Sequence, residues 1–164
     1  MNKVQIIYVM GVSGSGKSTI GSLLASALGY SFFDGDDFHT AANIKKMSNG
    51  EPLNDNDRKD WLESLNQLAH KNSAEGAVIV CSALKAKYRN ILKTDLNGNC
   101  TFLYLEGSME DISKRLSQRK NHFMPKGLLQ SQFDILEPPK KAITISINHS
   151  PEEIVILALK SLEN

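Results

Sequence analysis

The sequence is poor in the residues that mark several classes of protein. Of its 164 residues, two are cysteine, 11 are glycine and 5 are proline. Glycine and proline together make up about a tenth of the chain, far below the roughly 25–30% that is typical of low-complexity sequence, so disorder and collagen are excluded. Hydrophobic residues make up 41% of the chain, enough to bury a core without disulfides or metals. We therefore expect one domain that spans residues 1–164.

An excess of charge of one sign is also missing. The chain has 19 basic and 18 acidic side chains, a formal net charge of +1. Proteins that bind nucleic acid or anionic membranes generally need a net excess of positive charge. The balance argues against such a partner, although it leaves a local charged patch open.

Long apolar runs and an export signal are lacking as well. No apolar run reaches the roughly 18 residues of a membrane span. Lys3 and the apolar residues 4–12 are followed by residues 13–18, which place a charge and three hydroxyls where a signal peptide needs apolar side chains. Cys81 and Cys100 lie in hydrophobic stretches rather than at metal-ligand spacing, which predicts reduced core thiols. Together these features predict a cytoplasmic protein.

Five short segments are rich in Val, Ile, Leu, Phe and Tyr, and most are nearly continuous in these residues rather than alternating. This pattern is typical of strands in a parallel sheet that is covered on both faces. The predicted strands are residues 4–10, 30–34, 77–83, 100–105 and 142–147. Helical patterns fill the gaps, so we expect an α/β domain of βαβ units, with a five-stranded parallel sheet and helices on both faces.

The expected helices follow from apolar residues at helical spacing. The apolar stripes are Ile20, Leu23, Leu24, Ala27 and Leu28; Trp61, Leu62, Leu65 and Leu68; and Ile112 and Leu116, continued beyond a basic stretch by Leu128 and Leu129. Trp61 is interpreted as a core residue. The last helix is marked by Ser150-Pro151-Glu152-Glu153, which offers an N-cap, a proline at the first helical position and a capping-box glutamate.

Residues 11–18 match the phosphate-loop pattern G-x-x-x-x-G-K-[ST] at every fixed position, between the first strand and an amphipathic helix. Its glycines let backbone N–H groups curl closely around phosphate oxygens, and the helix directs its positive end at the same anion. We expect Lys17 to reach the β- and γ-phosphates and the Ser18 hydroxyl to bind Mg²⁺. The predicted nucleotide-binding residues of this loop are Gly11, Val12, Ser13, Gly14, Ser15, Gly16, Lys17, Ser18 and Thr19.

Acidic residues gather where the second predicted strand ends. Ligands of parallel α/β sheets lie at the carboxyl ends of the strands, so Asp34 and Asp36 are expected to face the γ-phosphate. One carboxylate would hold a water of Mg²⁺ while the other accepts the proton of an acceptor hydroxyl. Asp37 fits two roles equally well: a functional carboxylate or a solvated residue of the turn. His39 is consistent with either a substrate contact or a cap on the next helix.

Two features that mark ATPases and GTPases are missing. The third predicted strand is followed by small residues, where many P-loop ATPases and GTPases carry an aspartate near the metal. The guanine-reading sequence Asn-Lys-x-Asp does not occur. Both absences favour a small-molecule kinase over a motor or a switch.

Arginine is scarce, and its positions are informative because arginine grips carboxylates and phosphates with two donors. Arg115 and Arg119 are four residues apart, in a basic stretch that suits a lid over about residues 115–130, closing on ATP. Arg58 would hold an anionic acceptor, with an ion pair to Asp55 or Glu63 in its own helix as the alternative.

The chain resembles the gluconate kinases, whose characteristic segments occur in the same order from about residue 6 to residue 139. The resemblance rests on the phosphate loop and on residues 35–39, 50–58, 81–85, 88–89 and 119–123. It implies ATP-dependent phosphorylation of the C6 hydroxyl of D-gluconate, on a nucleoside-monophosphate-kinase-like fold, usually as a homodimer. The related shikimate kinases place two aspartates as Asp34 and Asp36 stand here, which favours Asp36 as the base and Asp34 as the metal neighbour.

The resemblance also implies roles for individual residues. It places the acceptor in a segment of about residues 36–62. The catalytic residues it implies are Lys17, Asp36 and Arg119, with Arg115 and Arg119 on ATP and with Ser18 and Asp34 at Mg²⁺. The implied substrate-binding residues are Asp36, His39, Arg58, Lys85, Arg89 and His122.

Two other functions are consistent with the phosphate loop. A shikimate or nucleotide kinase would share the loop and differ in its acceptor. A non-catalytic nucleotide sensor or a nucleic-acid-binding ATPase would bind ATP without acceptor-stimulated turnover, and the near-neutral charge argues against it.

Overall fold

The computed structural model describes residues 5–118 and 126–163. Its centre is a sheet of five parallel strands in the order β2-β3-β1-β4-β5, which confirms the predicted fold class. The strands are β1 (Ile6–Met10), β2 (Ser31–Asp34), β3 (Ala77–Val80), β4 (Cys100–Glu106) and β5 (Ile143–Ser146). All five predicted strands are present, most of them with shorter bounds. Because the strands are parallel, their carboxyl ends share one edge of the sheet.

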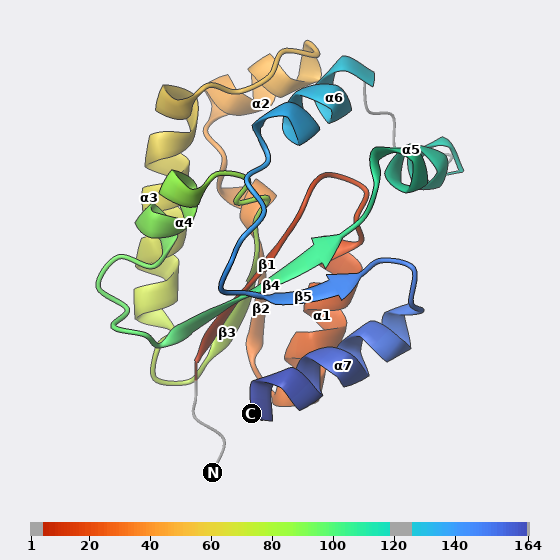
Figure 1. Ribbon diagram of the computed structural model, residues 1–164. Coiled ribbons are helices and arrows are strands. Elements are labelled where there is room, and N and C mark those ends of the chain that lie inside the picture. Colours follow the sequence, from red (N-terminus) through yellow and green to blue (C-terminus); the bar gives the residue numbers. More distant parts are fainter. Residues whose placement is uncertain (1–4, 119–125, 164) are drawn as a thin grey trace.

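Both faces of the sheet are covered by helices (Figure 1). In β1, Ile7 and Val9 join the core under α1 (Lys17–Leu28) and α7 (Pro151–Glu163). Ile6, Tyr8 and Met10 join the opposite core, under α3 (Asp55–Lys71) and α4 (Ala86–Leu92). Successive side chains of a strand point to opposite faces, so a strand that is covered on both sides is apolar throughout.

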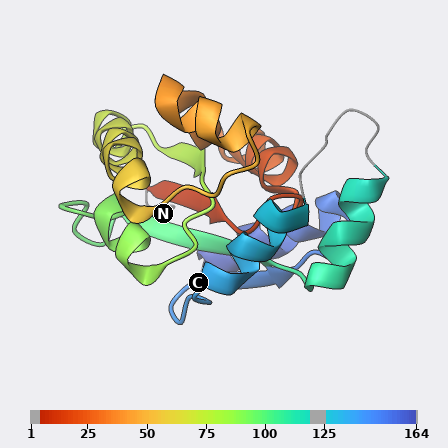
Figure 2. The same cartoon turned by 90° about the horizontal axis from the view of Figure 1, so that it is seen from above.

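The remaining helices lie near the carboxyl edge of the sheet, as Figure 2 shows from above. They are the 3₁₀ turn η1 (Gly35–Phe38), α2 (Ala41–Ser48), α5 (Met109–Ser117) and α6 (Lys126–Ile135). The apolar pattern of residues 112–129 belongs to two helices: α5 carries Ile112, and α6 carries Leu128 and Leu129. Both contribute buried residues to the core beneath α1.

Local capping explains where the helices around this edge begin. Asn54 and Asp57 form a reciprocal capping box that starts α3. The Thr40 hydroxyl accepts a hydrogen bond from the Asn43 backbone N–H at 3.1 Å and caps α2. His39 is therefore not the side-chain cap of the helix that follows it.

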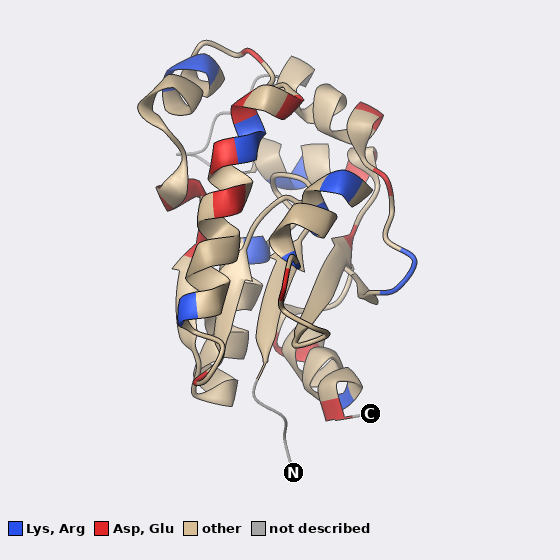
Figure 3. Cartoon of the chain, turned by 90° about the vertical axis from the view of Figure 1, so that its left-hand side faces the viewer, with Lys and Arg blue, Asp and Glu red and all other residues tan. Residues whose placement is uncertain are grey.

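Charged residues of both signs are interspersed along α3 rather than separated into patches (Figure 3). Within residues 5–118 and 126–163, no helix is long and apolar enough to cross a membrane. Cys81 is buried and Cys100 is half-buried, and both are free thiols. Burial raises the pKa of the Cys81 thiol to about 12, so this thiol stays protonated.

Candidate functional site

A cleft of about 850 Å³ opens at the carboxyl ends of β1, β2 and β3. The phosphate loop and the start of α1 line one end of it, and residues of η1, α3 and the segment before α3 line the other. Residues of α6 form a further wall. The parallel topology brings the phosphate loop and η1 to the same edge of the sheet, because each strand delivers its following loop there.

The phosphate loop connects β1 to α1, and Lys17 and Ser18 are the first two residues of that helix. The Lys17 ammonium donates to the Val12 carbonyl at 3.0 Å, so it lies folded over the loop. Gly14 has a φ of +83°, and a Cβ at this position would lie 2.9 Å from the Leu116 side chain of α5. A side chain is excluded here both by backbone conformation and by space.

Gln132 of α6 holds the loop at Ser13, and the sequence did not predict this contact. Its side-chain oxygen accepts from the Ser13 backbone N–H at 2.8 Å, and its amide nitrogen donates to the Ser13 hydroxyl at 3.1 Å. Both polar atoms of one amide thus bind a single loop residue 119 positions away. No motif surrounds Gln132; its position on α6 among apolar residues is the only signal that the sequence carries.

Two of the predicted metal-binding oxygens lie together in the cleft. The Ser18 hydroxyl donates to Asp34 Oδ2 at 3.0 Å, and Asp34 Oδ1 accepts from the Asp36 backbone N–H at 3.0 Å. Hydroxyl and carboxylate oxygens are the donors that Mg²⁺ prefers, so the pair fits this ion. Within residues 5–118 and 126–163, no cluster of three or more His, Cys, Asp or Glu side chains suits a metal.

Asp36 projects into the cleft with 83% of its side chain accessible to water. The walls of the cleft around it partly desolvate the carboxylate and, together with the neighbouring Asp34 carboxylate, raise the pKa of Asp36; Lys17 opposes the shift. Burial likewise lowers the pKa of Lys17, against the opposing attraction of Asp36. A carboxylate with a raised pKa is a stronger proton acceptor than an ordinary aspartate.

Gly35 and Trp61 fix η1, and with it Asp36. The Trp61 ring nitrogen donates to the Gly35 carbonyl at 2.7 Å. A Cβ on Gly35 would lie 2.3 Å from the Val80 carbonyl oxygen, so only glycine lets η1 approach β3 this closely. Trp61 is buried, as predicted, but it also lines the cleft, which the interpretation as a core residue missed.

His39 packs flat on Trp61, with ring centroids 4.0 Å apart and only 3% of its side chain exposed. Burial, with a smaller effect from the Arg58 charge, lowers the pKa of His39 to about 4. Asp36 lies 3.7 Å from Nε2 and favours the charged ring, but the low exposure of the ring makes burial the stronger effect. The ring is therefore neutral near pH 7, and it lines the cleft.

Arg58 lines the end of the cleft away from the phosphate loop and is only 9% exposed. Its guanidinium donates to the Leu53 carbonyl and, at 3.1 Å, to the Tyr88 hydroxyl. Within residues 5–118 and 126–163, no carboxylate lies within ion-pair distance of it. The predicted alternative, an ion pair with Asp55 or Glu63, does not form.

Other predicted residues lie outside the cleft or outside the described chain. Lys85 pairs with Asp55 at 3.2 Å, and Arg89 donates to the carbonyls of Ala83 and Glu137, so neither lines the cleft. Arg115 donates to the Ile147 carbonyl, and its guanidinium lies 3.9 Å from where a Cβ of Gly16 would stand. Arg119 and His122 fall outside the described residues.

Comparisons with known proteins agree on one group. A family model described as shikimate kinase matches residues 13–154. The thermosensitive gluconokinase of Escherichia coli (strain K12) is 48% identical over 147 residues, covering 86% of this chain and 78% of the relative. The probable gluconokinase of Xenopus tropicalis is 45% identical, covering 92% and 89%. The crystal structure of a gluconokinase from Sinorhizobium meliloti 1021 superposes with a TM-score of 0.90 at 40% identity, covering 99% and 94%.

Proposed function

The chain belongs to the gluconokinase family, within the larger shikimate kinase family, and from that premise we propose that it phosphorylates D-gluconate. The γ-phosphoryl group of ATP is transferred to the C6 hydroxyl, which gives 6-phospho-D-gluconate and ADP. The observation that carries this proposal is a single cleft with a phosphate loop at one end and a buried, unpaired arginine at the other. Such a cleft suits a nucleotide triphosphate facing a small anionic acceptor.

ATP is bound at the phosphate loop. Backbone N–H groups of the phosphate loop, other than the Ser13 N–H, which donates to Gln132, and the positive end of α1 hold the phosphates, and Lys17 supplies positive charge to the β- and γ-phosphates. Ser18 and Asp34 would hold Mg²⁺, which supplies charge neutralisation on the transferred group. Arg115 stands close enough to Gly16 to act on the same phosphates.

Asp36 is the proposed base. As the γ-phosphorus bonds to the C6 oxygen, its bond to the bridging oxygen of ADP breaks and the hydroxyl proton passes to the Asp36 carboxylate. The raised pKa of Asp36 suits this proton transfer. The fixed position of η1 on Trp61 and β3 orients the base before substrate binds.

The acceptor lies between Asp36 and Arg58. Arg58 grips the carboxylate at C1 of gluconate, and His39 and Trp61 form an aromatic wall beside the sugar chain. Lys85 and Arg89 are not part of this proposed contact set, because their charged groups are engaged elsewhere. We also propose that the protein is cytoplasmic and that it acts as a homodimer, as the resemblance to the gluconate kinases implies.

The test is acceptor-stimulated release of ADP. The purified protein is assayed with ATP and a panel of D-gluconate, other aldonates, shikimate and nucleoside monophosphates. We expect D-gluconate to give the highest kcat/KM, with phosphorus NMR showing the new ester at C6. Absence of stimulation by gluconate contradicts the proposal, and stimulation by shikimate or a nucleotide instead would identify the alternative kinase.

A further inference from the structure

Arg58 is a buried cation whose two neighbouring acids are both engaged elsewhere. Asp55 pairs with Lys85 and Lys87, and Asp57 pairs with Lys46 at 2.7 Å and caps α3. A buried guanidinium without a carboxylate carries a desolvation cost that an anionic ligand would relieve. The direction in which the Arg58 guanidinium points within the cleft therefore depends on the neutral groups that hold it.

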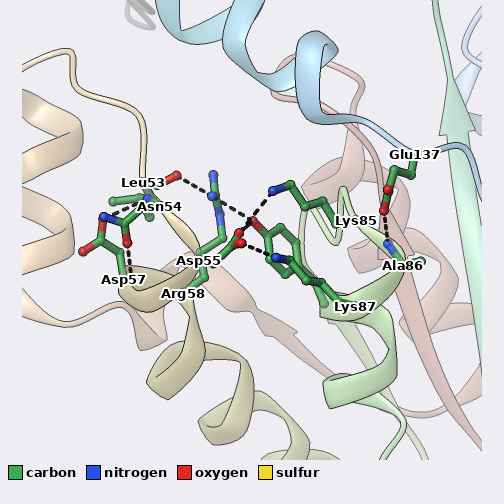
Figure 4. A network of polar contacts seen from close by, with 10 residues as sticks. Leu53, Asn54, Asp55, Asp57, Arg58, Lys85, Ala86, Lys87 and Glu137 are labelled. Carbon is green, nitrogen blue, oxygen red and sulfur yellow. Dashed lines mark hydrogen bonds and ion pairs between the residues drawn. The ribbon is translucent and has the colours of Figure 1, made fainter.

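Tyr88 of α4 is the side chain that holds it. Figure 4 shows Arg58 near Asp55, and the contacts of Asp55 with Lys85 and Lys87. The Tyr88 hydroxyl accepts from Arg58 at 3.1 Å, and the guanidinium carbon lies 5.2 Å from the centre of the Tyr88 ring. A phenol has one proton and two lone pairs. The Tyr88 proton is donated to Asp55 Oδ1, which leaves the lone pairs for Arg58.

Asp55 is held in turn by two lysines. Lys85 reaches Asp55 Oδ1 at 3.2 Å, and Lys87 binds Asp55 Oδ2. Lys87 and Tyr88, followed by Lys85, hold the pKa of Asp55 well below its usual range. Asp55 thus remains an anion across the physiological pH range and always draws the Tyr88 proton.

We infer that Tyr88 is a positioning residue that aims Arg58 at the acceptor carboxylate, with Asp55 and its two lysines fixing the direction of the Tyr88 hydroxyl. This inference rests on the proposed function, because it concerns how that acceptor is chosen. Tyr88 then determines selectivity for an acid over the corresponding neutral sugar derivative. Lys85 contributes through Asp55 and Tyr88, without touching the substrate.

The test is Tyr88→Phe, which keeps the ring under Arg58 and removes the hydroxyl. We expect KM for D-gluconate to rise about tenfold, with kcat and KM for ATP nearly unchanged. D-gluconamide, the uncharged isostere, is measured as a competitive inhibitor, and its inhibition constant should not change. The ratio of the KM for D-gluconate to the inhibition constant of D-gluconamide distinguishes a loss of carboxylate recognition from general damage to the cleft.

Tyr8→Phe is the matched control. Tyr8 is also buried beneath α3 and α4, and its hydroxyl donates to the Leu92 carbonyl at 2.7 Å, outside the cleft. We expect this variant to lose stability without changing the ratio of gluconate to gluconamide affinity. An equal rise for both ligands in Tyr88→Phe, or an unchanged KM for gluconate, would overturn the inference.

A second variant covers the case in which Tyr88→Phe folds poorly. Asp55 is 43% exposed, so Asp55→Asn should fold normally, and we expect it to raise KM for gluconate about threefold. Calorimetric binding of gluconate and gluconamide repeats the comparison without turnover. Wild-type protein that binds the acid selectively but does not phosphorylate it contradicts the proposed function alone, whereas equal binding of the two ligands by the wild type contradicts the inference.

Discussion

At its phosphate end the cleft is lined by the phosphate loop and the start of α1, with a wall from α6. At its other end, the proposed acceptor end, it is lined by residues of η1, of α3 and of the segment before α3. The phosphate end uses backbone N–H groups and glycines, so its geometry follows from a local sequence pattern. The acceptor end uses the packing of Trp61 on Gly35 and of Tyr88 on Arg58, across separations of 26 and 30 residues. The geometry that binds phosphate thus depends mainly on a local sequence pattern, while the proposed choice of acceptor depends on tertiary contacts.

The largest expected effect is at Asp36, where a substitution should impair turnover while leaving ATP binding at the phosphate end intact. Asp36→Asn removes the proton acceptor, so we expect kcat to fall by about 10²–10⁴-fold while the Kd for ATP stays nearly unchanged. Steady-state kinetics and nucleotide titration measure the two quantities. Asp37→Asn is the control, because Asp37 is exposed beside it. A near-normal kcat in Asp36→Asn together with a large loss in Asp37→Asn would identify Asp37 as the base.

The second effect is a pH dependence of stability at the acceptor end. The pKa of His39 is about 4 in the folded protein and near 6.5 when unfolded, so the unfolded state binds the proton first as pH falls. Above about pH 6.5 the neutral His39 ring therefore contributes about 3 kcal/mol to the free energy of unfolding. This contribution is lost as the pH falls toward 4. Urea unfolding at a series of pH values measures it.

His39→Gln is the comparison for this measurement, because the amide does not titrate. The difference in unfolding free energy between wild type and variant should shrink between pH 7 and pH 4, which cancels the titration of other carboxylates. A difference that stays constant over this range would show that His39 does not carry the dependence.

The third effect lies at the phosphate end. Gly14→Ala places a Cβ against Leu116 in a left-handed backbone conformation, so we expect KM for ATP to rise about 10- to 100-fold with the Kd for gluconate unchanged. Gly98→Ala is the control: Gly98 has a similar φ of +79° and no neighbouring atom within 4 Å. Equal effects of the two variants on KM for ATP would contradict a role of the loop geometry.

The smallest effect tests whether the phosphate end is wholly local. Gln132→Ala removes both hydrogen bonds to Ser13, and we expect KM for ATP to rise about threefold to tenfold. Gln130→Ala is the control on the same helix, where the lost partner is Asp134. An unchanged KM for ATP in Gln132→Ala would leave the phosphate loop as a self-sufficient unit.

Much of the fold was predictable because its signals are local. Continuous apolar segments marked all five strands, and the glycines and the lysine of the phosphate loop marked the start of α1. The bounds were less predictable, and residues 112–129 proved to belong to two helices. Apolar periodicity shows which residues are buried but not where a helix ends, because helix ends depend on caps and on packing against other segments.

The candidate site divides in the same way. Ser18, Asp34 and Asp36 come together because β1 and β2, on either side of β3, end at the same edge of one parallel sheet, and the sequence already predicts that parallel strands share this edge. Trp61 and Gln132 line the cleft through contacts that no sequence motif predicts. Arg89 was expected at the acceptor, but it lies outside the cleft, where it donates to the Ala83 and Glu137 carbonyls.

The sequence by itself determined the α/β class, the phosphate loop and the acidic residues after β2, since each depends on spacing within a short stretch of chain. Only the tertiary structure decided which arginine lines the cleft and what holds it there. Arg58 and Arg89 carry the same charge in similar helical contexts, and each donates hydrogen bonds to neutral groups. Arg58 lines the cleft that holds the phosphate loop, whereas Arg89 lies outside it. The difference lies in what surrounds each guanidinium after folding, and the residues that surround it are brought there by packing rather than by sequence distance.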